Sequence, residues 1–253
     1  MFDRTESSRI LSNIRFLATN EIGKYSTSCR RITLIYGAIQ IQPIIIIGCG
    51  GHASVLADLL LADGRNLKGF VDLEASESGK TLFGLPVLGD ESWLANKVRP
   101  KDVYLVKGIG MTGCCQRRQN SQVQLMKNGW RFTSCVHPSA IIGANVDLSN
   151  GVQVMAGVVI QSGSSIAEAA IVNTRASIDH DCVIEEYAHV APGAILAGGV
   201  RVEAGAHIGM GACLIQNVSV GRRAIVGAGA VVIKDVSAKS VVVGVPASSK
   251  CAP

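Results

Sequence analysis

The chain has 253 residues, of which 48% are hydrophobic and 17% charged, and a formal net charge of +5. No apolar run reaches the roughly 18 residues of a membrane-spanning helix, and Lys and Arg do not cluster as in a nucleic-acid-binding protein. The eight cysteines form no CxxC metal pattern and are typical of reduced thiols in a cytoplasmic protein. The length suits one large or two small domains.

Residues 1–42 contain no motif that predicts a fold or a site. Asp3, Glu6 and Glu21, together with the lack of an early apolar core, argue against a secretory signal. We therefore expect residues 1–42 to be a poorly ordered extension. A transit peptide and a start codon placed too far upstream are the alternatives.

The pattern changes at Pro43, where a small parallel α/β domain is predicted to begin and to extend over residues 43–138. Ile44–Ile47 is a short apolar run, typical of a buried parallel strand. Strand, glycine turn, helix and strand follow one another, as in a βαβ unit. The predicted elements are a strand at 44–47, a helix ending at 63–64, strands at 69–71 and 103–106, a helix at 115–127 and a fourth strand at 131–136.

A glycine turn separates the first strand from the first helix. Glycine lets the backbone approach a ligand closely, and the helix that begins near Gly51 presents free N–H groups, which suit a phosphate. Asp72 follows the second strand, where an acidic residue commonly holds a ribose hydroxyl. Because the turn reads Gly-x-Gly-Gly-His and not GxGxxG, both a nucleotide site and a plain packing turn remain open.

Sixteen consecutive hexads fill residues 142–237, and each begins with Ile, Leu or Val. The fifth position is small or compact, as at Ser164 and Ala230. A period of six excludes an amphipathic helix and fits a short strand followed by a tight corner. Positions five and one are two residues apart, so they share the inward face. Three hexads make one triangular coil, and we predict a prism of stacked parallel strands at 139–242 and a tail at 243–253.

Two groups of outward residues in the hexads carry chemistry. His180 and Asp181 fill positions three and four, and an imidazole beside a carboxylate suits a general base. A solvated surface pair is the alternative. His189 and His207 are 18 residues apart and stack on successive coils. They are either ordinary outward histidines or part of a metal site, although zinc would need a third ligand and His180 occupies a different position.

The hexads resemble the left-handed parallel β-helix of hexapeptide-repeat acyltransferases, which are trimers that bind acetyl-CoA between neighbouring prisms. Together with the preceding domain, the chain from about residue 44 to 247 resembles bacterial nucleotide-sugar N-acetyltransferases and the related sialic-acid O-acetyltransferases. The motifs that carry this resemblance are Gly50-Gly51-His52, His137-Pro138, Asn173-Thr174, His180-Asp181-Cys182 and the tail Gly244-Val245-Pro246-Ala247.

This resemblance implies a Rossmann-like α/β domain followed by a left-handed β-helix, in a cytoplasmic homotrimer. It implies acetyl-CoA as co-substrate, no metal, and transfer to the 4-amino group of a UDP- or TDP-linked amino-deoxy sugar for surface glycan synthesis. O-acetylation of a sialic acid or related sugar is the first alternative. A metal-dependent hydratase similar to β-helical carbonic anhydrases and a purely structural trimer are the others.

The resemblance also assigns roles to single residues. His180 would be the catalytic base, and Asp181 would increase its basicity. Acetyl-CoA contacts fall on His189, Met210 and Ala228. Nucleotide-sugar contacts fall on Gly50, Gly51, His52, Asp72, Leu73, Gly108 and Asn173. The loop at 110–115 departs from the Gly-Asn or Gly-Asp-Asn of the family, which leaves the details of sugar recognition open.

Overall fold

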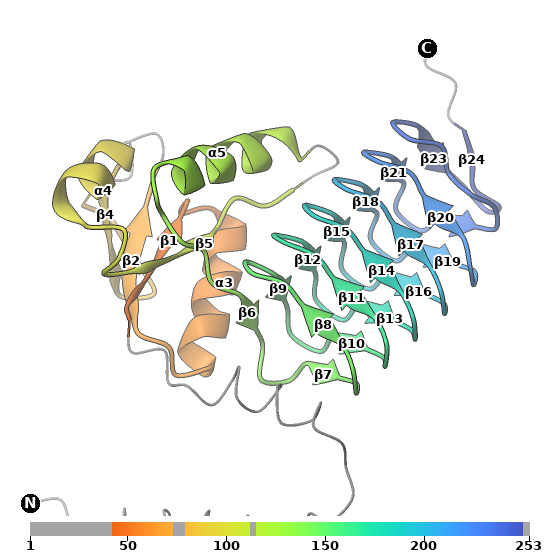
Figure 1. Cartoon of the computed structure of the whole chain (residues 1–253), viewed down its shortest axis with the longest axis horizontal. Coiled ribbons are helices and arrows are strands. Elements are labelled where there is room, and N and C mark those ends of the chain that lie inside the picture. Colours follow the sequence, from red (N-terminus) through yellow and green to blue (C-terminus); the bar gives the residue numbers. More distant parts are fainter. Residues whose placement is uncertain (1–41, 73–78, 112–114, 250–253) are drawn as a thin grey trace, which may run out of the picture. The chain divides into compact units, whose positions relative to one another are not determined.

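The computed structural model describes residues 42–72, 79–111 and 115–249. The predicted extension at 1–42 therefore lies outside the described residues except for Gln42, and so does Leu73. The described chain forms an α/β part followed by stacked triangular coils (Figure 1). Within the described residues, no helix is long and apolar enough to cross a membrane.

The α/β part is built on a five-stranded sheet in the order β3-β4-β2-β1-β5. β1 pairs in parallel with both β2 and β5, as the sequence predicts. Alternate isoleucines of β1 belong to two different core clusters, so this strand is buried on both faces. The elements are β1 (Ile44–Ile47), α3 (Gly51–Ala62), β2 (Leu67–Val71), β3 (Thr81–Leu82), β4 (Leu85–Gly89), α4 (Glu91–Lys97), β5 (Tyr104–Lys107) and α5 (Gln116–Lys127).

The structure differs from the predicted elements of this part in two places. The hairpin β3–β4 and the helix α4 occupy a region where the sequence pattern predicts no element. The strand predicted at 131–136 was wrong as one continuous strand. Phe132 makes a single parallel bridge to Leu105, whereas Cys135 and Val136 pair with β9 in the coils. The chain therefore leaves the sheet of the α/β part after Thr133, and its next residues pair with the first coils of the hexads.

The hexads form a left-handed β-helix with three parallel sheets, in which two-residue strands occupy positions six and one. Sheet I contains β6 (Cys135–Val136), β9 (Gln153–Val154), β12 (Ile171–Val172), β15 (His189–Val190), β18 (His207–Ile208), β21 (Ile225–Val226), β23 (Val241–Val243) and the antiparallel β24 (Ser248–Ser249). Sheet II contains β7 (Ile141–Ile142), β10 (Val159–Ile160), β13 (Ser177–Ile178), β16 (Ile195–Leu196), β19 (Cys213–Leu214) and β22 (Val231–Val232). Sheet III contains β8 (Asp147–Leu148), β11 (Ser165–Ile166), β14 (Val183–Ile184), β17 (Arg201–Val202) and β20 (Ser219–Val220).

Side chains at positions five and one fill the prism and form one continuous cluster. Position four has a positive φ in every corner from Asn145 to Gly229. This left-handed backbone turns the chain from one sheet into the next, and it explains why glycine and asparagine recur there. Asp181 is one of these residues, with φ 57°, so the repeat itself fixes the backbone beneath the predicted base.

Candidate active site

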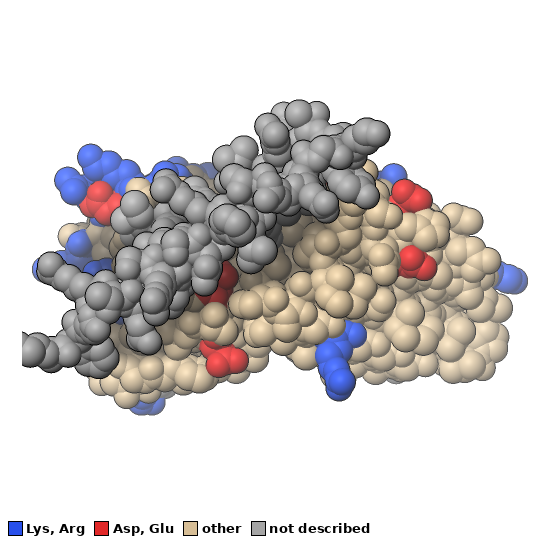
Figure 2. All heavy atoms as spheres, turned by 90° about the horizontal axis from the view of Figure 1, so that it is seen from below, with Lys and Arg blue, Asp and Glu red and all other residues tan. Residues whose placement is uncertain are grey.

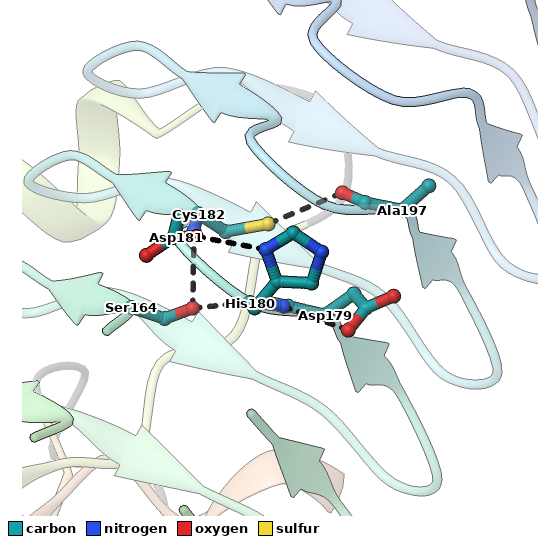
Figure 3. A network of polar contacts seen from close by, with 6 residues as sticks. All are labelled: Ser164, Asp179, His180, Asp181, Cys182 and Ala197. Atoms are coloured by element: carbon teal, nitrogen blue, oxygen red, sulfur yellow. Dashed lines mark hydrogen bonds and ion pairs between the residues drawn. The ribbon is translucent and has the colours of Figure 1, made fainter. Parts of the chain in front are cut away.

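His180 and Asp181 lie in the corner between β13 of sheet II and β14 of sheet III (Figure 3). Nδ1 of His180 is 2.8 Å from Oδ2 of Asp181, and both side chains are exposed. Since a carboxylate only accepts, Nδ1–H donates and Nε2 carries the free lone pair of the neutral imidazole. The hydrogen bond to Asp181, followed by the charge of Asp179, raises the pKa of His180. The geometry therefore suits a general base that acts through Nε2.

The corner that carries His180 and Asp181 contacts both the preceding coil, through Ser164, and the following coil, through Gly198. The buried hydroxyl of Ser164 donates to the carbonyl of Asp179 at 2.8 Å and accepts from the N–H of Cys182 at 3.1 Å. Ser164 thus clamps both ends of the segment that carries His180 and Asp181 (Figure 3). On the next coil, a Cβ added to Gly198 would lie 2.5 Å from Nε2 of His180. The imidazole therefore occupies space that only glycine leaves open.

The glycine turn after β1 leads directly into α3, whose N-terminus is at Gly51. Gly50 and Gly51 are exposed, and a Cβ at either would meet no atom within 4 Å, so the surface beside this helix end is open. Sγ of Cys49 donates to Oδ2 of Asp72 at 3.3 Å, which ties the turn to the end of β2. A helix N-terminus with an adjacent carboxylate fits a nucleotide site.

Gly108 has a packing role in the structure. A Cβ there would lie 2.6 Å from Cγ2 of Ile46 and 2.8 Å from Cβ of Ala53. Glycine is thus needed where the end of β5 passes β1 and α3. This packing contact does not test the predicted ligand contact of Gly108, which is buried in the isolated chain.

His52 connects the α/β part to the coils. Its Nε2 lies 2.8 Å from Oε1 of Gln153, a buried residue of β9 in sheet I. Burial lowers the pKa of His52 to about 4, with the nearby charge of Arg118 acting in the same direction. His52 is therefore neutral at physiological pH, and its partner Gln153 is a residue that the sequence motifs did not identify.

His189 lies on β15 of sheet I, and its imidazole is hydrogen-bonded to the loop before α5 and to Asn173, a half-buried residue that directly follows β12. Nδ1 of His189 lies 3.0 Å from the carbonyl of Met111, and Nε2 lies 3.1 Å from Nδ2 of Asn173. Burial, followed by the proximity of His207, lowers the pKa of His189 to about 3. His189 is only 6% exposed, so in the isolated chain it is not a surface histidine.

The predicted stack of His189 and His207 is present, with the strands in register and the ring centroids 5.0 Å apart in an edge-on arrangement. Among the described residues, no group of three or more His, Cys, Asp or Glu side chains could hold a metal ion. The two stacked rings lie on sheet I, whereas His180 lies at the corner between sheets II and III.

Met210 and Ala228 are exposed and occupy the same corner position on successive coils, joined by a backbone hydrogen bond from Gly229 to the Met210 carbonyl. They follow β18 and β21, at the corner where sheet I gives way to sheet II. The structure therefore brings together two of the three predicted acetyl-CoA residues, whereas His189 lies on β15 of sheet I. The structure does not bring Met210 and Ala228 to His180, since the two corners flank opposite edges of sheet II.

Comparisons with known proteins show which family the chain resembles. Residues 43–124 match the family described as the PglD N-terminal domain. A variant of perosamine N-acetyltransferase from Caulobacter crescentus, solved with CoA and GDP-perosamine, is 36% identical, with 85% of this chain and 100% of that chain covered and a TM-score of 0.77.

Two further solved structures are similar over nearly the same length. The acetyltransferase domain of PglB from Neisseria gonorrhoeae is 32% identical, with 83% of this chain and 100% of that chain covered and a TM-score of 0.76. WeeI from Acinetobacter baumannii is 28% identical, with 82% and 99% covered and a TM-score of 0.74.

Proposed function

The chain belongs to the nucleotide-sugar N-acetyltransferases of the hexapeptide-repeat family, and we propose that it transfers the acetyl group of acetyl-CoA to the 4-amino group of a nucleotide-linked amino-deoxy sugar. The observation that carries this proposal is the His180–Asp181 pair, joined at 2.8 Å on an exposed corner. An imidazole whose Nδ1 is engaged by a carboxylate is oriented to take a proton at Nε2.

The proposed reaction is a direct transfer between the two substrates. The amine attacks the thioester carbonyl, a carbon–nitrogen bond forms, and Nε2 of His180 takes the amine proton. Asp181 stabilises the resulting imidazolium. The tetrahedral oxyanion then collapses, the carbon–sulfur bond breaks, and the proton on His180 passes to the departing thiolate, which leaves as free CoA.

Backbone donors near His180 suit the oxyanion of this reaction. The N–H of Gly198 makes no hydrogen bond within the described residues, and Gly198 lies against the imidazole from the next coil. A preorganised backbone donor of this kind typically contributes about 2.7–4 kcal/mol to the lowering of a barrier. We therefore assign the oxyanion contact to Gly198.

The second element of the proposal is a homotrimer in which neighbouring prisms share each active site. Sheet II lies between the corner of His180 and the corner of Met210 and Ala228. Exposed isoleucines lie on its strands and directly after them: Ile141 and Ile195 on β7 and β16, and Ile215 and Ile233 after β19 and β22. Figure 2 shows that most of the β-helix surface visible in that view, from below Figure 1, carries no charged side chains. Packing sheet II against a neighbouring copy would bury these residues and bring the two kinds of corner together.

The nucleotide sugar would bind at the glycine turn. Gly50, Gly51 and His52 lie at the N-terminus of α3, and Asp72 lies at the end of β2. Gly108 begins the loop after β5, and Asn173 follows β12, one coil beyond Gln153, the partner of His52. His189 lies beside Asn173, between this site and the Met210 corner. We propose that the enzyme works in the cytoplasm, where acetyl-CoA is made and where the described cysteines, all free thiols, remain reduced.

A thiol-release assay tests this function. Purified full-length enzyme is mixed with acetyl-CoA and a panel of UDP-, TDP- and GDP-linked 4-amino sugars. We expect free CoA and an N-acetylated product with at least one sugar, and a loss of about 10²–10⁴-fold in kcat for His180→Ala, with the KM for acetyl-CoA nearly unchanged. Acetylation of a hydroxyl in place of the amine, or full turnover by His180→Ala, would contradict the proposal.

A further inference from the structure

Along one edge of β5 and of the loop that follows it, every second backbone carbonyl accepts a hydrogen bond, and each of these bonds comes from a different residue. Leu105 accepts from the N–H of Thr133 at 3.0 Å, as in an ordinary sheet. Beyond that point the described residues add no further strand on this side of the sheet. Side chains replace the missing strand, and they donate to the carbonyls of Lys107 (Gln153 Nε2, 2.8 Å), Ile109 (Arg118 Nε, 3.0 Å) and Met111 (His189 Nδ1, 3.0 Å).

These three donors attach the loop to the β-helix. Gln153 and His189 are themselves residues of sheet I. Arg118, on α5, uses Nη1 to donate to the carbonyl of Ala169 at 2.8 Å, so it bridges the loop and the coils. All three side chains are at least nine-tenths buried, where a hydrogen bond that lost its partner would be costly. These hydrogen bonds therefore fix the position of the loop at 107–111 along the axis of the β-helix.

Gln153 carries a second constraint, because both ends of its amide are used. The carbonyl of Lys107 can only accept, so the atom facing it must be the NH₂ group. The amide oxygen then faces Nε2 of His52 and can only accept from it. His52 must therefore carry its proton on Nε2, which leaves a lone pair on Nδ1.

We propose that Gln153 is a positioning residue for the nucleotide-sugar site. It fixes the tautomer of His52 and, at the same time, the position of the loop at 107–111 along the β-helix. This inference rests on the proposed function of the glycine turn. With Nδ1 as an acceptor, His52 receives a hydrogen bond from a hydroxyl or N–H of the nucleotide sugar. It is not a donor to the diphosphate, which leaves the phosphates to the free N–H groups of α3.

Two variants of the full-length enzyme separate the two bonds of Gln153. Gln153→Leu removes both. Gln153→Glu keeps an acceptor for His52 but places a carboxylate oxygen against the Lys107 carbonyl. We expect the KM for the nucleotide sugar to rise about tenfold or more in both, because the loop is misplaced, while the KM for acetyl-CoA stays within about twofold. Gln124→Leu, on the exposed side of α5, is the matched control and should leave both values unchanged.

Imidazole ¹⁵N spectra of the enzyme without substrate read the tautomer directly. The chain has five histidines, and His52→Asn assigns the signal of His52. We expect the Nε2–H form in the wild type and a mixture of tautomers in Gln153→Leu. In Gln153→Glu, the carboxylate should raise the pKa of His52 from its value of about 4.

The outcomes distinguish this proposal from the proposed function. A wild-type enzyme that turns over no amino sugar would overturn the function but leave the spectra to decide the role of Gln153. A lower melting temperature with the KM for the nucleotide sugar and the His52 tautomer unchanged would show that Gln153 is only structural. If Gln153→Leu does not fold, the near-isosteric Gln153→Glu decides through two other readouts, the KM for the nucleotide sugar and the pKa of His52; if neither changes, the proposal is overturned.

Discussion

The basicity of His180 comes from a carboxylate that the same corner supplies. The hydrogen bond from Nδ1 to Asp181 raises the pKa of His180. Catalysis needs the neutral imidazole, so activity is lost as the pH falls through this raised pKa. Asp181, which makes His180 a stronger base, therefore also determines the pH below which the enzyme loses activity.

Asp181→Asn tests this coupling. The amide removes the charge that favours the imidazolium, so the pKa of His180 should fall towards the ordinary value of about 6.5. We expect the acid limb of kcat/KM to move to lower pH, and the plateau rate to drop because the imidazolium formed during transfer is less stabilised. A pH–rate profile measures both. An acid limb at the wild-type position would mean that Asp181 does not act on His180.

Gly198 makes room for the imidazole of His180, since a Cβ there would lie 2.5 Å from Nε2. Gly198→Ala should push the imidazole aside and lower kcat by about tenfold or more, without preventing folding because the side chain of His180 can rotate. The control is the same substitution in a His180→Ala background, where the clash is absent and no further loss is expected. Equal losses in the two backgrounds would show that Gly198 acts by another route.

At the scale of single elements, the corner depends on a polar residue inside an apolar prism. Ser164 fills an inward position, is 1% exposed and makes two hydrogen bonds to the segment at 179–182. Ser164→Ala leaves the N–H of Cys182 and the carbonyl of Asp179 without this partner. We expect a loss of about 1–3 kcal/mol in the free energy of unfolding together with a lower kcat.

The matched control is Ser240→Ala, which removes a hydroxyl bonded to the Ser237 carbonyl at the far end of the prism. It should leave kcat unchanged. Denaturant unfolding and steady-state kinetics measure the pair of variants. If Ser164→Ala lowers stability but not kcat, Ser164 supports the coil and not the catalytic corner.

Regular elements could be predicted from the sequence because each is marked by a pattern of residues that are close together in the chain. The hexads define the position of every strand from β7 to β22, and the apolar run of Ile44–Ile47 identifies β1. The hairpin β3–β4 has no such signal. β3 has only two residues, and Pro86, which cannot donate to a ladder, interrupts the apolar run of β4.

The candidate site could be predicted only where its chemistry lies within one motif. His180 and Asp181 are adjacent in the chain, so their pairing follows from the corner. Gln153 and His52 are 101 residues apart, and no local pattern connects them. A buried glutamine at a strand position is the one signal that the hexads offered, since burial requires a partner for both ends of the amide.

At the scale of the whole molecule, the exposed isoleucines of sheet II predict association. Ile195 on β16 is 52% exposed, and we place it in the contact between copies. Ile195→Glu should give a monomer with an intact β-helix and very low activity, because a buried charge without a partner is costly. Light scattering and circular dichroism check the two statements.

Val183→Glu is the control for this prediction. Val183 occupies the same hexad position on sheet III, next to Arg201 in the register of the strands. The new carboxylate therefore has a basic neighbour and lies away from the proposed contact. A trimer with full activity is expected, whereas dissociation by both variants would argue against sheet II as the specific interface.

The central claim is that each active site combines His180 of one copy with the substrate-binding residues of the next. Complementation between two impaired variants, one defective in kcat and one in the KM for the nucleotide sugar, tests it most directly. His180→Ala and Gln153→Leu enzymes are unfolded together, mixed in equal amounts, refolded, and assayed at a low concentration of nucleotide sugar. With shared sites, about a quarter of the sites in random trimers receive both intact halves, so activity should rise well above that of either parent. If both halves belong to one chain, every site keeps one defect, and activity no higher than the average of the two parents would contradict the account.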